Sequence, residues 1–154
     1  MNIKIKTLQE KDLQFLIEVR NECKNFLHNA NEFSLDECRK WFIETNPIFY
    51  LIEKDGFPIG YFRTSDWNID SCFVGGDLHK DYRGKGYMKI AYPLLFDKLL
   101  DLKVKTVFLS VLEFNTVAYS LYKKLGFEEI SRNDYVQLGS NKQAVNINMK
   151  KNIK

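Results

Sequence analysis

The sequence predicts an α/β fold in which helices cover both faces of one mixed β-sheet. β-rich and helical segments alternate in the order βααβββαβαββ, and no Pro-, Gly- or Ser-rich linker interrupts them. Of the 154 residues, 45% are hydrophobic and 28% are charged, which is typical of a globular protein with a buried core. We therefore expect residues 1–154 to form a single domain.

The N-terminal elements follow from the periodicity of apolar residues. Residues 2–8 alternate apolar and polar side chains as a strand does, and residues 9–20 place apolar side chains at helical spacing. A second helix is expected after Ser34, because Ser34 and Glu37 have the spacing of a capping box.

Three strands are expected next. Residues 49–53 and 58–64 flank Asp55-Gly56, a dipeptide that is typical of hairpin turns. Residues 71–78 are a further β-rich run, in which the Gly75-Gly76 pair indicates a bulge or a group that passes close to the backbone.

Two helices and three strands are expected in the rest of the chain, from residue 86 onward. Pro93 lies inside the first of these helices, where it should kink the helix or remove one hydrogen bond. Asn115 and Gly126 are typical of the beginning and the end of the second helix. The predicted ranges are a helix over 86–101, a strand over 106–112, a short helix over 115–126, and strands over 135–138 and 144–149.

The composition excludes several classes of protein. No apolar run approaches the roughly 20 residues of a membrane helix, and the N-terminus has no signal-peptide core, so we expect no membrane association. The three cysteines lack CxxC spacing, which indicates reduced thiols in a cytoplasmic protein. Two histidines are too few to predict a structural zinc site, so we expect no metal. A net charge of +3 is too small to predict nucleic-acid binding.

Residues 78–88 are the most informative segment. They read Leu-His-Lys-Asp-Tyr-Arg-Gly-Lys-Gly-Tyr-Met, which is a strand end, a glycine-rich turn and a helix start. Gly84 and Gly86 let successive N–H groups point into one concavity, and the helix N-terminus adds free donors and the positive end of its dipole. This arrangement predicts a phosphate or pyrophosphate site with Arg83 and Lys85 at its rim. A basic surface turn explains the segment equally well when it is taken alone.

A second pattern follows the strand predicted over 106–112. Residues 115–127 have the spacing N-x-x-A-x-x-x-Y-x-x-x-G-F, and the earlier segment matches [Q/R]-x-x-G-x-[G/A] as Arg83-x-x-Gly86-x-Met88. With both patterns in this order, the chain resembles the GNAT family of N-acetyltransferases. Met88 departs from the small residue that the family has at this position, and it would narrow the turn or shift the helix start.

The resemblance implies where acetyl-CoA, the co-substrate, would bind. In the family, a mostly antiparallel sheet splays apart between its fourth and fifth strands, here 71–80 and 106–113, and acetyl-CoA lies in the gap. The backbone N–H of Leu78 would polarise the acetyl carbonyl. The residues implied to contact acetyl-CoA are Leu78, Arg83, Gly84, Lys85, Gly86, Tyr87, Met88, Asn115 and Tyr122.

The resemblance also implies a general acid. Tyr122 would donate a proton to the departing thiolate, although its place on the apolar stripe of its helix suits a core tyrosine equally well. Many family members have a Glu on the fourth strand as general base, but the matching residue here is Phe73. Asp77, His79 and Glu113 remain as candidate bases, and a chain of water molecules would also suffice.

The implied reaction is direct attack of a primary amine on acetyl-CoA in a ternary complex. The acceptor would be a small-molecule or peptide amine, such as an amino sugar, a protein N-terminus or another small amine. The residues expected to line its pocket are Arg20, Asn21, Trp41 and Trp67. Family members are often dimers, which leaves a homodimer open. The alternative is a non-catalytic acyl-CoA-binding or sensing module, which Met88 and the missing Glu favour and the intact Tyr122 opposes.

Overall fold

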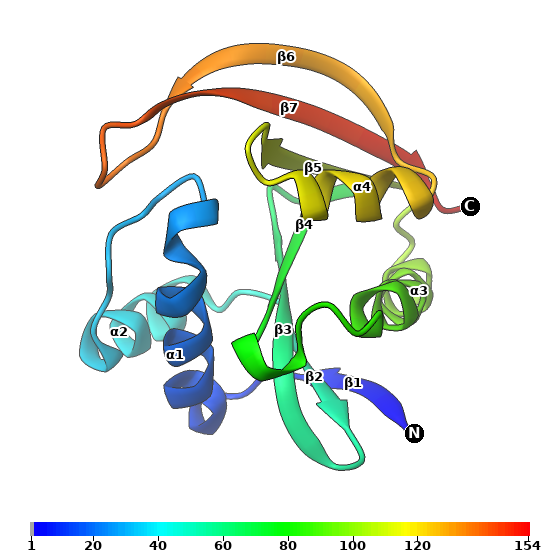
Figure 1. The fold of residues 1–154 in the computed structure, drawn as a ribbon. Helices are drawn as coiled ribbons and strands as arrows, with labels where there is room; N and C mark the ends of the chain where they lie inside the picture. Colours follow the sequence, from blue (N-terminus) through cyan, green and yellow to red (C-terminus); the bar gives the residue numbers. More distant parts are fainter. Residues whose placement is uncertain (1) are drawn as a thin grey trace.

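The computed structural model describes residues 2–154 as one seven-stranded sheet with four α-helices around it (Figure 1). The helices are α1 (Leu13–Cys23), α2 (Leu35–Thr45), α3 (Tyr87–Asp101) and α4 (Thr116–Lys124). The strands are β1 (Ile3–Thr7), β2 (Phe49–Lys54), β3 (Phe57–Ser65), β4 (Ser71–Leu78), β5 (Thr106–Leu112), β6 (Glu128–Val136) and β7 (Gln143–Asn152). Within this range, no helix has the length and apolar character that crossing a membrane requires.

The sheet splays between its fourth and fifth strands. The strand order is β1-β2-β3-β4-β5-β7-β6, and neighbouring strands are antiparallel except for the parallel pair β4 and β5. β4 and β5 pair only where Ser71–Phe73 lies beside Thr106–Phe108. Beyond this point β4 continues to pair with β3, and β5 with β7. The expected sheet, mostly antiparallel and splayed at this position, is therefore confirmed.

Helices cover both faces of the sheet, as expected. α1 and α2 lie on one face, and α3 and α4 lie on the other (Figure 1). The side chains of β2 show how both faces are buried: Phe49 and Leu51 enter the core under α1 and α2, whereas Tyr50 and Ile52 enter the larger core under α3. The alternation of side chains along a strand produces this division.

Most predicted boundaries differ from the structure by a few residues at most, and two differences have a physical cause. The strand predicted over 135–138 is wrong, because β6 spans Glu128–Val136 and the chain then enters a turn. β6 is an edge strand that pairs with β7 alone, and most of its side chains are exposed, so it lacks the apolar alternation of a buried strand. In addition, a 3-10 turn over Glu10–Asp12 precedes α1, which then continues to Cys23.

The predicted helix ends have the expected contacts. Ser34 Oγ accepts a hydrogen bond from Glu37 N (3.1 Å), and the Glu37 carboxylate accepts one from Ser34 N (3.2 Å), which completes the capping box. Asn115 Oδ1 accepts from Ala118 N at 3.4 Å, and Gly126 ends α4 with a φ of 95°. Pro93 is exposed, so the carbonyl that its ring leaves without an N–H partner can bond to water.

Burial should protect the thiols of Cys23 and Cys72 from modification. It raises the pKa of Cys23 to about 12 and the pKa of Cys72 to about 11, so almost no thiolate is present near pH 8. In a Cys38→Ser variant, we expect a disulfide thiol reagent to find no reactive thiol in the native protein and two in guanidinium chloride. Rapid reaction of either thiol in the native protein would contradict this packing.

Candidate active site

Backbone donors of β4 face the gap between β4 and β5. His79 N donates to Ile59 O of β3 at 2.8 Å, and Leu78 pairs with Gly60. Because backbone groups of an antiparallel strand alternate in direction, the N–H groups of Leu78 and Gly76 point away from β3, toward the side where β5 has separated. The predicted position of Leu78 beside the gap therefore leaves its N–H available to a bound carbonyl oxygen.

The glycine-rich turn joins this gap to the start of α3. Gly84 and Gly86 have φ angles of 73° and 81°, and an added Cβ at either would meet no atom within 4 Å. These positions therefore favour glycine for its backbone conformation, since space is ample. α3 begins at Tyr87, so its first N–H groups open onto the turn. The turn thus fits a phosphate group, with the exposed Lys85 at its edge.

Arg83 does not extend over the rim as expected. Its Nε donates to Leu78 O at 3.0 Å, and its Nη2 lies 2.9 Å from the Sγ of Cys23. The guanidinium therefore folds back over the end of β4 and connects the turn to the last residue of α1.

Met88 packs against the core under α3. A Cβ at Gly76 would lie 2.8 Å from the Met88 methyl group and 2.7 Å from the Phe62 ring, so the Met88 side chain covers β4 at the gap. Met88 is also half-buried against the core under α3. Its side chain thus fills space beside Gly76, and the absence of a side chain at Gly76 makes room for it.

Tyr122 lies on α4 with its ring in edge contact with Tyr92 and Phe127, at centroid distances of 5.9 and 5.8 Å. Burial raises the pKa of Tyr122, although the neighbouring Tyr92 hydroxyl acts in the opposite direction. The phenol therefore stays protonated at neutral pH, as a proton donor must. The Tyr92 hydroxyl is itself buried and makes no hydrogen bond of ordinary geometry with residues 2–154.

Asp77 is already engaged with two partners. Its Oδ2 accepts from the Tyr61 hydroxyl and from Arg63 Nη1, the latter at 2.9 Å, and its side chain is only 9% exposed. Burial alone would lower the pKa of Arg63, but the Asp77 carboxylate raises it above the ordinary value. Asp77 is thus one half of an ion pair on the face of the sheet that α1 and α2 cover.

The other two candidate bases lie elsewhere. His79 Nδ1 accepts from Asp81 N at 3.2 Å, and its Nε2 lies 3.8 Å from Glu22 on α1. Glu113 follows the end of β5 and is exposed. The structure therefore does not bring the three candidates together. No three His, Cys, Asp or Glu side chains are grouped to hold a metal ion anywhere in the described part of the chain.

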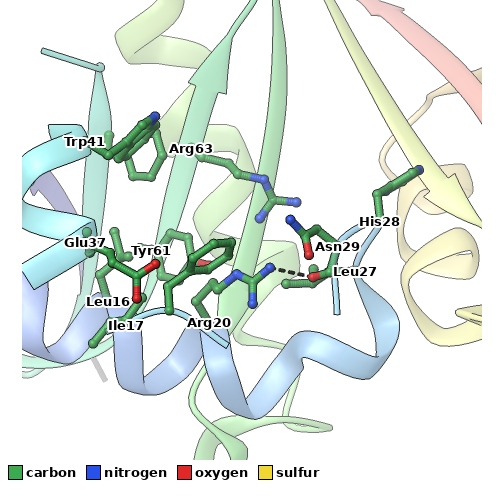
Figure 2. A pocket seen from close by; sticks show the side chains of 13 residues that line it. Leu16, Ile17, Arg20, Leu27, His28, Asn29, Glu37, Trp41, Tyr61 and Arg63 are labelled. Atoms are coloured by element: carbon green, nitrogen blue, oxygen red, sulfur yellow. Dashed lines mark hydrogen bonds between the residues drawn. The ribbon is translucent and has the colours of Figure 1, made fainter. Parts of the chain in front are cut away.

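A cavity of about 550 Å³ lies between the sheet and the helices α1 and α2 (Figure 2). Arg20 and Trp41 line it, as predicted. Asn21 instead supports the wall, because its side-chain amide exchanges hydrogen bonds with the backbone of Phe33 at 3.0 and 3.2 Å. Trp67 is not among the lining residues, and its indole donates to Thr64 Oγ1 at 3.1 Å.

The sequence interpretation missed Arg63, Tyr61 and His28 as cavity residues. His28 Nε2 lies 2.6 Å from Asn146 Oδ1, and the Asn146 amide nitrogen donates to two other asparagine oxygens. This orientation of Asn146 requires that His28 Nε2 carries the proton, which leaves Nδ1 as an acceptor. Burial lowers the pKa of His28, so the ring is neutral at pH 7.

No local signal marks these missed residues. His28 lies in a polar loop between α1 and α2, and its partner Asn146 is 118 residues away in the chain. Arg63 has an ordinary strand position, and only the pairing of β3 with β4 brings it to Asp77.

Comparison with known proteins agrees with this architecture. Residues 13–127 match the model of the acetyltransferase (GNAT) family. The chain is 28% identical over 115 residues to the peptidyl-lysine N-acetyltransferase YjaB of Salmonella typhimurium. The aligned region covers 75% of this chain and 73% of that protein.

The solved structures that share the fold include two acetyltransferases named for their substrates. One is a phosphinothricin acetyltransferase of the GNAT superfamily from Sinorhizobium meliloti in complex with acetyl-CoA, with 16% identity, a TM-score of 0.83, and coverage of 99% of this chain and 89% of that one. The other is the ribosomal-protein-alanine N-acetyltransferase from Brucella melitensis, with 18% identity, a TM-score of 0.83, and coverage of 97% and 99%. By the family match over residues 13–127, the chain belongs to the GNAT acetyltransferase family.

Proposed function

We propose that this protein transfers an acetyl group from acetyl-CoA to a primary amine by direct attack in a ternary complex. The observation that carries the proposal is the gap between β4 and β5, which has free backbone donors along β4 and a glycine-rich helix start at its end. On one face of β4, Met88 of α3 lies over Gly76, and on the other face Arg63, which lines the cavity, lies over Gly75. Donor and acceptor can therefore meet across the splayed strands.

The proposed chemistry follows from these positions. The amine nitrogen attacks the thioester carbon, the C–N bond forms, and the C–S bond breaks as the thiolate leaves. The N–H groups of Leu78 and Gly76 stabilise the negative charge that develops on the carbonyl oxygen. Tyr122 gives its proton to the thiolate. The diphosphate of acetyl-CoA lies at the turn, with contacts from Gly84, Lys85, Gly86, Tyr87 and Met88, while Arg83 and Asn115 fix the flanking backbone.

The proton of the amine needs an acceptor. Asp77 and His79 keep this role in the proposal, since the second carboxylate oxygen of Asp77 has no hydrogen-bond partner among residues 2–154 and His79 lies beside the turn. Glu113 or water are alternatives. His28 joins them because it is neutral, lines the cavity and presents an unprotonated Nδ1.

The acceptor is proposed to be a small-molecule or peptide amine. Relatives with this fold include proteins named for peptidyl lysine, ribosomal-protein alanine, phosphinothricin and spermidine. All are amines, and the proposal for this chain rests on that shared chemistry. We also propose that the protein acts in the cytoplasm, without a metal or nucleic acid.

A thermal melt with and without acetyl-CoA tests the donor site, with ADP as the control ligand. At 100 times its dissociation constant, acetyl-CoA should stabilise the protein by about 2.7 kcal/mol, which raises Tm by roughly 5–11 °C at about 2–4 °C per kcal/mol. No shift at millimolar acetyl-CoA would refute the proposal. A shift without turnover on any amine would instead support the alternative of a non-catalytic acyl-CoA-binding module.

A further inference from the structure

The cavity under α1 and α2 has one apolar end and one cationic end. Trp41, Phe49 and Leu16 contribute to its apolar end, near Glu37 of α2. Arg20 and Arg63 lie together at the other end, next to the loop that carries His28 (Figure 2). The ligand of such a cavity should have an apolar part and a polar part, each facing the matching wall.

The cationic end carries more positive than negative charge. Arg63 is paired with Asp77, but no carboxylate of residues 2–154 lies within 4 Å of the Arg20 guanidinium. Glu37, the acidic residue of the lining, bonds instead to the backbone N–H of Ser34. His28 is neutral at pH 7, so the excess charge at this end is that of Arg20.

Arg20 is held in place without being neutralised. Its two Nη atoms donate to the backbone carbonyls of Asn29 and Asn31, and its Cζ lies 4.6 Å from the centre of the Phe33 ring. A guanidinium has five N–H groups, so three are not used by these two hydrogen bonds. Burial lowers the pKa of Arg20, which means that the charged form pays a desolvation cost that a bound anion would offset.

The cationic end is also the end that meets the gap. A Cβ at Gly75 would lie 2.6 Å from Arg63 Nη2, so the guanidinium covers β4 just past the point where β4 leaves β5. On the far side of the gap, His28 contacts Asn146 of β7, which pairs with Leu112 of β5. An amine that reaches the gap must therefore lie close to any anion held by Arg20 and Arg63.

We propose that the acceptor is a free α-amino acid with an apolar side chain, whose carboxylate is bound by Arg20 and Arg63 and whose side chain lies toward Trp41 and Phe49. In this class the amine and the carboxylate are attached to the same carbon, so both reach the cationic end while the side chain fills the apolar end. Polyamines and lysine side chains have no anion near the amine. The inference rests on the proposed acetyl transfer.

The test compares an amino acid with its own carboxamide. L-methionine and L-methioninamide share the amine and the side chain, and only the acid has the negative charge. The amide amine is the easier of the two to deprotonate, so a preference for the acid cannot come from amine basicity. We expect wild type to favour the acid about 10- to 100-fold in kcat/KM, and in Kd measured by calorimetry with CoA bound.

Arg20→Gln should remove most of this preference, because glutamine can still donate to a loop carbonyl but carries no charge, and the charge of the remaining Arg63 is paired with Asp77. Arg20→Lys should keep part of it. Lys24→Gln is the matched control, since Lys24 is a neighbouring cation that pairs with Glu32 outside the cavity lining, and it should leave the preference unchanged. The ratio of kcat/KM for the acid to that for the amide separates loss of carboxylate recognition from loosening of the loop that carries Asn29 and Asn31. A loosened loop would weaken the binding of both ligands equally and leave this ratio unchanged.

Equal use of acid and amide by the wild type would overturn the proposal, and so would an unchanged ratio in Arg20→Gln. These results would leave acetyl transfer itself standing if the amide is acetylated. Conversely, if calorimetry shows tighter binding of the acid but neither ligand is acetylated, the proposed acetyl transfer is refuted and the proposed carboxylate site is retained. The two failures are thereby distinguishable.

Discussion

Tyr122→Phe is expected to lower kcat about 100- to 10,000-fold while leaving acetyl-CoA affinity unchanged. The substitution removes the phenolic hydroxyl, and the ring keeps its packing against Tyr92 and Phe127. Without the phenol, the thiolate must leave unprotonated or take its proton from water. Steady-state kinetics gives the loss in kcat, and a melt with acetyl-CoA shows whether the donor site is intact.

Tyr119→Phe is the matched control for this prediction. Tyr119 lies on the same helix, and its hydroxyl donates to Glu129 of β6 at 2.6 Å. It should retain the wild-type kcat. If Tyr122→Phe also retains it, Tyr122 is a core tyrosine, as its position on the apolar stripe of α4 would allow. Since burial raises the pKa of Tyr122, its own ionisation should limit the rate only at a pH above its ordinary value of about 10.

Local patterns predicted most of this fold because each depends on residues close in sequence. The capping box at Ser34 and the ranges of β4 and β5 follow from such patterns, and the structure reproduces them. The splay between β4 and β5 came from the family resemblance, because strand separation has no signature of its own in periodicity. β6 was placed wrongly because an exposed edge strand does not need an apolar alternation.

The candidate site was less predictable than the fold. The glycine-rich turn is a local feature, so Gly84 and Gly86 could be found from sequence. The cavity is assembled from residues that meet only through strand pairing and loop packing, such as Arg63 with Asp77 and His28 with Asn146. Asp77 could be named from the sequence as a candidate base, but the sequence could not show that Arg63 lies over Gly75 and pairs with the Asp77 carboxylate.

Asp77→Ala is expected to destabilise the protein by about 2–4 kcal/mol, seen as a lower midpoint in urea with an unchanged m-value. The substitution leaves the Arg63 guanidinium without its counter-ion and the buried Tyr61 hydroxyl without an acceptor. A fully buried pair would lose more, but the Arg63 side chain is 39% exposed and water can solvate part of its charge. Asp81→Ala, which removes an exposed carboxylate nearby, should change stability little.

A second substitution separates the structural role of Asp77 from a role as general base. Arg63→Met in the Asp77→Ala background removes the orphaned charge, so it should recover part of the lost stability if the ion pair is the cause. Asp77→Asn preserves the shape of the side chain and one acceptor oxygen, but it cannot take a proton from an amine. If this variant folds and keeps its kcat, the carboxylate acts by holding Arg63 at the gap. If it folds and binds acetyl-CoA as the wild type does but loses kcat, the carboxylate takes the proton of the amine.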